Sequence, residues 1–470
     1  IDSGHWPEYF IGAYPSCFKV TEAAGHVMGQ APGTHWYHAH KHGSTSINLY
    51  NGLAGALIIE GDYDRELEQI YPGLKQTQKV LVVQSFTDQP NLERNSNVAR
   101  VNTTNGTQVT PAVPATSTTA AIPQKGPTIV MRPGEIQLWR IINGQVQRTI
   151  AATFALGPKT TGALPKFRQI AQDGVQLNLA NYNAQPLTAP DSDRNGTKFT
   201  LAPGGRIDIL VQAPQIPAGT TQSYELAQVV NLTVCGDPVN DQFPSSLERS
   251  QGGNYPEFPK FLADVVPPFD ARKDLDFGWE PFRTKNGPAT NAVGTTKATH
   301  AKTIPFQVQV GNDKVGFETI DITTSRGPSW TIDGEQFEEG TFSQTMVLGD
   351  REEWKIWNTT SVAHPFHIHV NPFQVVEVFD PNTAGNSFVR EQNGVWQDNV
   401  LIPGGKTDTN GQLILDANGR AATPGYIRIR SKFVDFKGSF VLHCHILGHE
   451  DRGMMQLVQV VDGTTTIHHH

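Results

Sequence analysis

The C-terminal part of the chain contains the sequence HCHILGHEDRGM at residues 443–454, which places one thiol, three imidazoles and a thioether close together. A cysteine thiolate with two histidines and a more distant methionine is the ligand set of a type 1 (blue) copper, an electron-transfer metal. Because successive side chains of an extended strand point to opposite faces, His443 and His445 are directed away from the side chain of Cys444. These two histidines therefore suit a second metal site, which one residue of backbone would connect to the first.

Two further histidine clusters support a metal site of this kind. They are GTHWYHAHKHG at residues 33–43 and HPFHIH at residues 364–369. The chain has sixteen histidines, of which the last three, at residues 468–470, are interpreted as the remnant of a purification tag. Ten of the other thirteen lie in the three clusters. Zinc is the alternative metal, but zinc sites typically use closely spaced cysteines, and Cys17, Cys235 and Cys444 are far apart.

With these motifs the chain resembles the multicopper oxidases, and among them the laccase-like enzymes of bacteria. That family has four copper motifs: H-x-H, a second H-x-H, H-x-x-H-x-H, and H-C-H-x-x-x-H-x-x-x-x-M. The last three occur here, between residues 38 and 454. The resemblance implies copper as the cofactor, in type 1, type 2 and type 3 centres.

The resemblance also implies which residues bind each copper. The type 1 ligands would be His364, Cys444, His449 and, as the weak axial ligand, Met454. Met455 is the neighbouring axial candidate, but the spacing of the family motif favours Met454. His367 would bind the type 2 copper. The type 3 pair would be bound by His38, His40, His369, His443 and His445.

The first H-x-H motif of the family is not found in the sequence. Only 37 residues precede His38; they contain no H-x-H, and His5 and His26 are isolated. We therefore expect that the N-terminal part of the first domain is missing, so that the chain supplies six of the eight histidines of the cluster. Such a chain would bind type 1 copper well and the cluster coppers poorly. His42 shares the strand face of His38 and is an alternative ligand, although a role outside the ligand set is favoured.

Composition favours an all-β fold of several domains. The 470 residues imply about three domains, and 44 glycines, 32 prolines and 17% charged residues suit short strands joined by many turns. Strand-like runs occur at residues 55–60, 79–84, 207–211 and 440–445. We expect Greek-key β-sandwiches, and the resemblance implies three cupredoxin-like domains, the first incomplete at its N-terminus. The predicted divisions are domain 1 (1–90), a linker (91–125), domain 2 (126–239, without copper ligands), a connector (240–299), domain 3 (300–461) and a tail (462–470).

Charge and cysteine content bear on the binding partners and the location of the protein. A net charge of −8 without a basic block disfavours nucleic-acid binding, and no apolar run is long enough to cross a membrane. Cys444 must be a free thiolate to bind copper. Cys17 and Cys235 could form a disulfide between domains 1 and 2 or remain two free thiols, and a secreted or periplasmic location would allow the disulfide.

The function implied by the resemblance is oxidation of a small aromatic donor, a phenol or an aromatic amine, with dioxygen as the acceptor. Electrons would pass from the type 1 copper through Cys444 to the cluster. Glu450, and after it Asp451, are candidates for supplying the protons; the alternative for both is an ordinary surface or capping carboxylate. With only five methionines, an organic donor is favoured over cuprous ions.

Three alternatives to this function remain. The first is an electron-transfer protein that uses only the type 1 site, and the second is an oxidase of ferrous or cuprous ions. The third is a relative without copper, which the complete type 1 ligand set disfavours. A relative of the copper nitrite reductases is also disfavoured, because histidines flank Cys444 on both sides.

Overall fold

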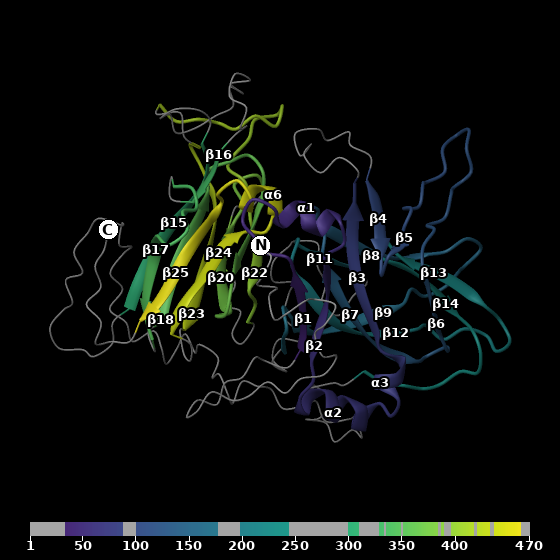
Figure 1. The fold of residues 1–470 in the computed structure, drawn as a ribbon. Helices are drawn as coiled ribbons and strands as arrows, with labels where there is room; N and C mark the ends of the chain where they lie inside the picture. Colours follow the sequence, from purple (N-terminus) through teal and green to yellow (C-terminus); the bar gives the residue numbers. More distant parts are fainter. Residues whose placement is uncertain are drawn as a thin grey trace, which may run out of the picture.

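The computed structural model describes residues 33–87, 100–176, 198–243, 299–309, 329–332, 335–348, 351–383, 387–389, 396–417, 421–432 and 437–461. Within these ranges the chain is all-β, as predicted, with strands in five sheets and a few short helices. Two β-sandwiches lie side by side, and the N-terminal described segment lies between them (Figure 1). The described helices are α1 (Thr45–Tyr50), α2 (Asp62–Ile70), α3 (Leu74–Thr77) and α6 (Leu447–Glu450).

The C-terminal sandwich contains the copper motifs of residues 364–369 and 443–454. Its first sheet has the order β16 (Ser329–Ile332), β15 (Thr299–Gln309), β18 (Arg351–Asn358), β23 (Gly425–Lys432), β20 (Phe373–Phe379) and β21 (Ser387–Val389). Its second sheet has the order β17 (Phe342–Val347), β25 (Met455–Val461), β24 (Gly438–Cys444), β19 (His364–Ile368) and β22 (Asn399–Ile402). Apolar side chains of both sheets, such as Trp354 and Phe366, form one buried core that also includes Cys444 and Met454.

The central sandwich contains none of the predicted ligands. Its larger described sheet has the order β10 (Val175–Gln176), β9 (Lys166–Gln172), β12 (Arg206–Gln212), β7 (Ile136–Asn143), β3 (Lys79–Phe86), β4 (Val101–Thr104) and β5 (Thr107–Gln108). The other has the order β11 (Lys198–Leu201), β8 (Ile150–Leu156), β13 (Gln222–Leu226), β14 (Val230–Val234) and β6 (Thr128–Met131). Strand β8 alternates buried and exposed residues along most of its length, as expected for a strand with one face in a core.

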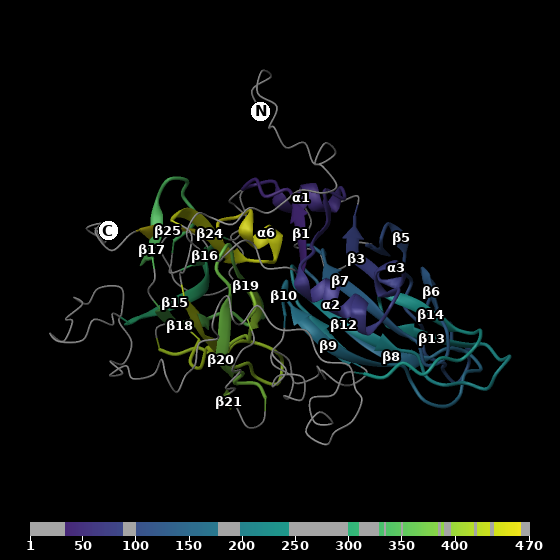
Figure 2. The same cartoon turned by 90° about the horizontal axis from the view of Figure 1, so that it is seen from below.

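Strand β7 is buried on both faces, which explains its nearly continuous apolar sequence. Trp139 and Ile141 point into the core between the two sheets. Ile136 and Leu138 point to the outer face, where they pack against apolar residues of α2 and α3. The two helices therefore act as a third layer over this part of the sheet (Figure 2).

The sheet pairing corrects the predicted boundary between domains 1 and 2. Strand β3 falls in the predicted domain 1, but it pairs in parallel with β7 from Lys79↔Trp139 to Val83↔Asn143. Strands β4 and β5 fall in the predicted linker, yet they extend the same sheet. An apolar run such as that of β3 looks the same whichever sheet it joins, so periodicity could locate the strand but could not assign it to a domain.

The N-terminal described segment is a two-stranded ribbon followed by helices. Strand β1 (Gly33–His38) pairs antiparallel with β2 (Ala54–Ile59), and α1 lies between them in the chain. Helix α1 packs beside α6 of the C-terminal sandwich. Leu49 and Tyr50 of α1 form a small buried cluster with Val146 and Leu447, so all three parts of the chain meet there. No helix among the described residues is long and apolar enough to cross a membrane.

Candidate metal centres

The first candidate metal centre is formed by His364, Cys444 and His449. His364 begins β19, Cys444 ends β24 and His449 lies in α6. The Nδ1 atoms of His364 and His449 lie 3.4 Å and 3.7 Å from the Cys444 sulfur and 3.3 Å from each other. Two imidazole nitrogens and one sulfur that converge in this way fit the trigonal His₂Cys set of a type 1 copper.

Met454 is held beside this centre by the backbone. Its amide donates to the His449 carbonyl at 3.0 Å, and its own carbonyl accepts from the Cys444 amide at 3.0 Å. The side chain is fully buried in the same core as Cys444, whereas Met455 begins strand β25. Backbone contacts therefore hold Met454 beside Cys444 and His449, and its axial role stays a prediction.

The imidazoles of this centre are held neutral and oriented. Burial lowers the pKa of His364 to about 3 and that of His449 well below its usual value. On the far side of the His364 ring, Nε2 lies 2.9 Å from the Thr360 hydroxyl, which fixes the ring. A neutral imidazole with one nitrogen engaged presents the other as a metal ligand.

Trp330 covers one face of His449, and the sequence analysis did not identify it. The indole of this β16 residue stacks on the imidazole with ring centroids 3.5 Å apart and planes 13° from parallel. Its edge-on contact with His364 has a centroid separation of 5.7 Å. No spacing rule marks this tryptophan, because β16 lies more than a hundred residues before His449 in the chain.

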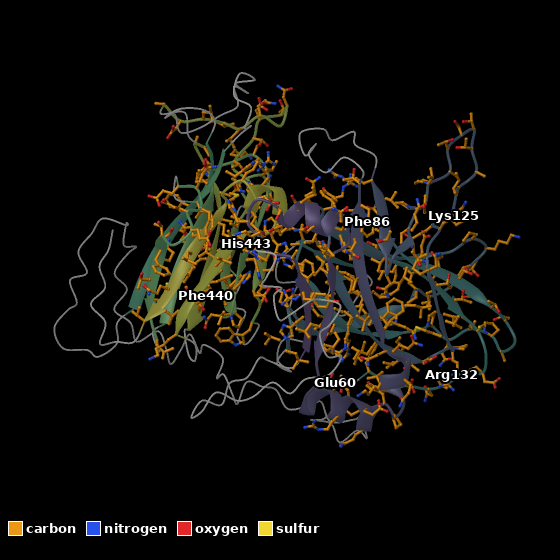
Figure 3. The ribbon with its side chains drawn as sticks, in the orientation of Figure 1. Glu60, Phe86, Lys125, Arg132, Phe440 and His443 are labelled. Carbon is orange, nitrogen blue, oxygen red and sulfur yellow. The ribbon has the colours of Figure 1, made fainter. Side chains whose placement is uncertain are left out.

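The second candidate centre is a cluster of six histidines, which we call the histidine cluster: His38, His40, His367, His369, His443 and His445. It lies where the C-terminal sandwich meets the N-terminal segment, as the label of His443 shows in Figure 3. The Nε2 atom of His443 lies 3.1 Å from that of His40 and 3.3 Å from that of His369. This convergence is of the kind that holds a metal ion.

The rings of His38, His367 and His445 form the other part of the histidine cluster. His445 lies with ring centroids 5.7 Å from His38 and 5.4 Å from His367. Both ring nitrogens of His445 are buried and have no hydrogen-bond partner among the described residues. Buried polar atoms without partners are costly, so the site fits a metal that would bind them.

The electrostatic environment keeps the histidine cluster in its ligand form. Burial, followed by the charge of His40, lowers the pKa of His38 to about 3. Burial, followed by the charge of His443, lowers the pKa of His40 to about 4. These two rings are therefore neutral at physiological pH, and neutral imidazoles bind transition metals without first losing a proton.

The two candidate acids occupy different environments. Glu450 is fully buried beside the cluster: its Oε1 accepts from the Thr45 hydroxyl at 3.0 Å, and its Oε2 lies 3.1 Å from Nδ1 of His443. Asp451 instead accepts from the backbone amides of Thr45 and Ser46, both at 2.8 Å, at the start of α1. The geometry therefore places Glu450 at the cluster and gives Asp451 a capping contact.

The remaining candidate residues are His42 and the cysteines other than Cys444. The ring of His42 lies against Phe337, with centroids 4.9 Å apart, and not in the histidine cluster as defined above. Cys235 is partly exposed and forms no disulfide with another cysteine of the described residues. Cys17 lies outside the described residues, as do His5 and His26, so the proposed disulfide stays a prediction.

Comparisons with known proteins identify multicopper oxidases as similar to this chain. The multicopper oxidase family profile matches residues 299–416 and 420–464. The laccase of Bacillus subtilis (strain 168) is 23% identical over 431 residues, covering 91% of this chain and 70% of that protein. The multicopper oxidase mco of Staphylococcus aureus is 21% identical over 437 residues, covering 92% and 69%.

Solved structures show the same fold. A multicopper oxidase from Campylobacter jejuni, described as a metallo-oxidase, matches with a TM-score of 0.53 and 18% identity, covering 92% of this chain and 72% of that one. A laccase from Pediococcus acidilactici matches with a TM-score of 0.53 and 19% identity, covering 92% and 70%. The sandwiches described above are therefore of the cupredoxin-like kind found in these proteins.

Proposed function

Since the chain belongs to the multicopper oxidase family, we propose that it couples oxidation of small aromatic donors to the four-electron reduction of dioxygen to water. Phenols and aromatic amines are the proposed donors. They would be oxidised one electron at a time beside His364, Cys444 and His449, and dioxygen would be reduced at the histidine cluster. Copper, when bound at the two centres, supplies the redox chemistry.

The observation that carries this proposal is the position of Cys444 between the two centres. Its sulfur faces His364 and His449, while the residues on either side of it, His443 and His445, belong to the histidine cluster. Nε2 of His443 lies 3.1 Å from that of His40. A covalent path of one residue therefore joins the centres, which supports electron transfer from one to the other.

At the histidine cluster, where dioxygen would be reduced, the protein would contribute a proton source and an environment closed to bulk water. Glu450 touches His40 and His443, with Nδ1–oxygen distances of 3.5 Å and 3.1 Å. Burial raises the pKa of Glu450 to about 7, so this carboxyl can hold a proton near neutral pH. His443 and His445 are almost completely buried, which limits access of bulk water.

The donor would reach the molecule near His449. This histidine is only partly buried, in contrast to the fully buried His364. Trp330 lies over the His449 ring and offers an aromatic surface on which a flat donor can pack. These features support an aromatic donor. The alternatives are an oxidase of ferrous or cuprous ions and an electron-transfer protein.

Spectroscopy and oxygen uptake of the copper-loaded chain test the proposal. We expect a blue type 1 band, a near-ultraviolet band from a copper pair, and oxygen consumption with a phenol. Blue colour without the near-ultraviolet band or oxygen uptake would favour the electron-transfer protein. Oxygen uptake with ferrous or cuprous ions but not with phenols would favour the metal-ion oxidase.

Replacement of Met454 tests the axial position. We expect Met454→Leu to raise the reduction potential of the type 1 copper, because it removes a soft axial donor that stabilises the oxidised metal. Redox titration of the blue band measures the effect. Met455→Leu is the matched control and should leave the potential unchanged. An unchanged or lower potential in Met454→Leu would contradict the assignment.

We also propose a secreted or periplasmic location. A disulfide between Cys17 and Cys235, one of the two alternatives that the sequence leaves open, would need such an oxidising compartment. Thiol titration of the denatured chain, with and without reductant, measures whether this disulfide exists.

A further inference from the structure

The central sandwich provides none of the predicted ligands, yet one of its loops approaches His445 of the histidine cluster directly and His367 through Asp398. The loop consists of residues 203–206, and we call it the central loop. It leads into strand β12, which begins at Arg206. Its contacts reach Asp398, which lies next to His367, and also the ring of His445. Both histidines belong to the C-terminal sandwich.

Arg206 binds Asp398 with both arms of its guanidinium. Nη1 donates to Oδ1 at 2.7 Å and Nη2 donates to Oδ2 at 2.6 Å. The Arg206 side chain is almost completely buried, and it also donates to the backbone carbonyls of Thr34, Gly204 and Asp173. One side chain thus connects the N-terminal ribbon, the central sandwich and the C-terminal sandwich, in a paired geometry that fixes orientation as well as distance.

Asp398 in turn orients His367. The carbonyl oxygen of Asp398 accepts from Nδ1 of His367 at 2.7 Å, and its carboxylate oxygen Oδ1 lies 3.4 Å from the same nitrogen. With Nδ1 carrying the proton, Nε2 is left as the ligand atom. Burial alone would raise the pKa of Asp398, but the charge of Arg206, and after it the contact with His367, holds it well below its usual range, so the carboxylate stays ionised.

Asp173 of the central sandwich binds the backbone of the same segment. Its Oδ2 accepts from the amides of Asp398 and Asn399 at 3.3 Å and 3.2 Å, and its Oδ1 accepts from the Arg206 amide at 2.8 Å. The Asn399 side chain donates to the Pro203 carbonyl at 2.7 Å. The strand that follows Asp398 is therefore fastened to the central loop at several points.

Gly204 makes the second contact with the cluster. Its φ of +80° is in the left-handed region, which favours glycine. A Cβ atom added there would lie 2.5 Å from Nε2 and Cδ2 of His445 and 2.8 Å from Nδ2 of Asn399. The backbone of the central loop thus forms the wall against which the His445 ring rests.

From these contacts we propose that the central loop positions His367 and His445 for metal binding, through the Arg206–Asp398 pair and through the close approach of Gly204. The copper-binding role of the two histidines rests on the proposed function. The positioning itself is a property of the protein without metal. Arg206 and Gly204 are positioning residues, and neither contacts a reacting atom.

Gly204→Ala tests whether the backbone at Gly204 fixes the position of the His445 ring. Gly219→Ala is the matched control. Gly219 has a φ of +73° in the same sandwich, but nothing lies within 4 Å of its added Cβ, so it shares the backbone strain without the contact. In crystal structures of the metal-free proteins, we expect the His445 ring to move by roughly 1 Å in Gly204→Ala, enough to restore ordinary contact, and not to move in Gly219→Ala. An unmoved His445 in Gly204→Ala would overturn this part of the proposal.

Arg206→Lys tests the paired contact, with Arg140→Lys as its matched control. Arg140 is equally buried, and its carboxylate partners Asp208 and Asp64 belong to the central sandwich and to helix α2. Lysine keeps the charge but cannot donate from two arms to one carboxylate. We expect Arg206→Lys to weaken copper binding at the histidine cluster about 10-fold to 100-fold, and Arg140→Lys to leave it unchanged.

Copper competition with a chelator measures the copper affinity of the histidine cluster. The intensity of the blue band measures how much copper the type 1 centre holds in the same samples. We expect the blue band to be retained in all four variants. Equal copper retention in Arg206→Lys and Arg140→Lys would overturn the positioning role of Arg206. If the unsubstituted chain binds no copper at either centre, the proposed function fails, and the crystal structures still decide whether the central loop fixes His445.

Discussion

Cys444→Ser is expected to abolish the blue colour of the copper-loaded protein and to reduce donor oxidation to the level of the copper-free chain. The Cys444 sulfur lies 3.4 Å and 3.7 Å from the Nδ1 atoms of His364 and His449. A thiolate binds copper strongly and gives the type 1 centre its colour, whereas a serine hydroxyl is a hard ligand that stays protonated near neutral pH. The substitution removes only this ligand atom and leaves both imidazoles in place.

The measurements are the visible absorption spectrum, the copper content per chain and the rate of oxygen uptake with a phenol. Cys235→Ser is the matched control, because Cys235 is a partly exposed cysteine of the central sandwich. We expect that variant to match the unsubstituted chain in all three measurements. A Cys444→Ser protein that stays blue, or that oxidises donors at the original rate, would rule out the proposed electron path.

Much of the candidate site could be predicted from the sequence because its ligands come in short motifs. Cys444 ends strand β24, His449 lies in the short helix α6, and Met454 directly precedes strand β25, so their spacing alone brings them near each other. The alternation of side chains on β24 likewise separates Cys444 from His443. In the structure these residues lie at two adjoining centres, as their spacing suggested.

The supporting residues could not be predicted because they depend on packing between distant segments. Trp330, Arg206 and Asp398 stand in sequences that resemble ordinary strands and turns, and their roles arise only when the sandwiches meet. The division between domains failed for a similar reason. Strand β3 was located correctly, but its apolar run does not encode the parallel pairing with β7 that places it in the central sandwich.

The acidic pair after His449 shows how the structure separates two candidates that the sequence left together. Glu450 is fully buried and contacts His40 and His443, whereas Asp451 binds the first backbone amides of α1. Both carboxylates were candidates for proton supply. Of the two, Glu450 is the one that contacts the histidine cluster, so the two residues should respond differently to amide substitution.

Glu450→Gln is expected to slow reoxidation of the reduced, copper-loaded protein by dioxygen about 10²-fold, the lower end of the range for loss of a general acid. Glutamine preserves the size of the side chain and can still accept from the Thr45 hydroxyl, but it carries no ionisable proton. Stopped-flow mixing with dioxygen measures this step. Anaerobic reduction of the type 1 copper by a phenol should be unchanged, because the donor approaches near His449.

Asp451→Asn is the matched control for that measurement. It weakens the contacts at the start of α1 and should cost up to about 1 kcal/mol of stability, without slowing the reaction with dioxygen. Equal slowing in both variants would indicate that the amide substitutions act through the packing of α1 against α6. An unchanged rate in Glu450→Gln would show that the protons reach the cluster by another route, because glutamine has no carboxyl proton to transfer.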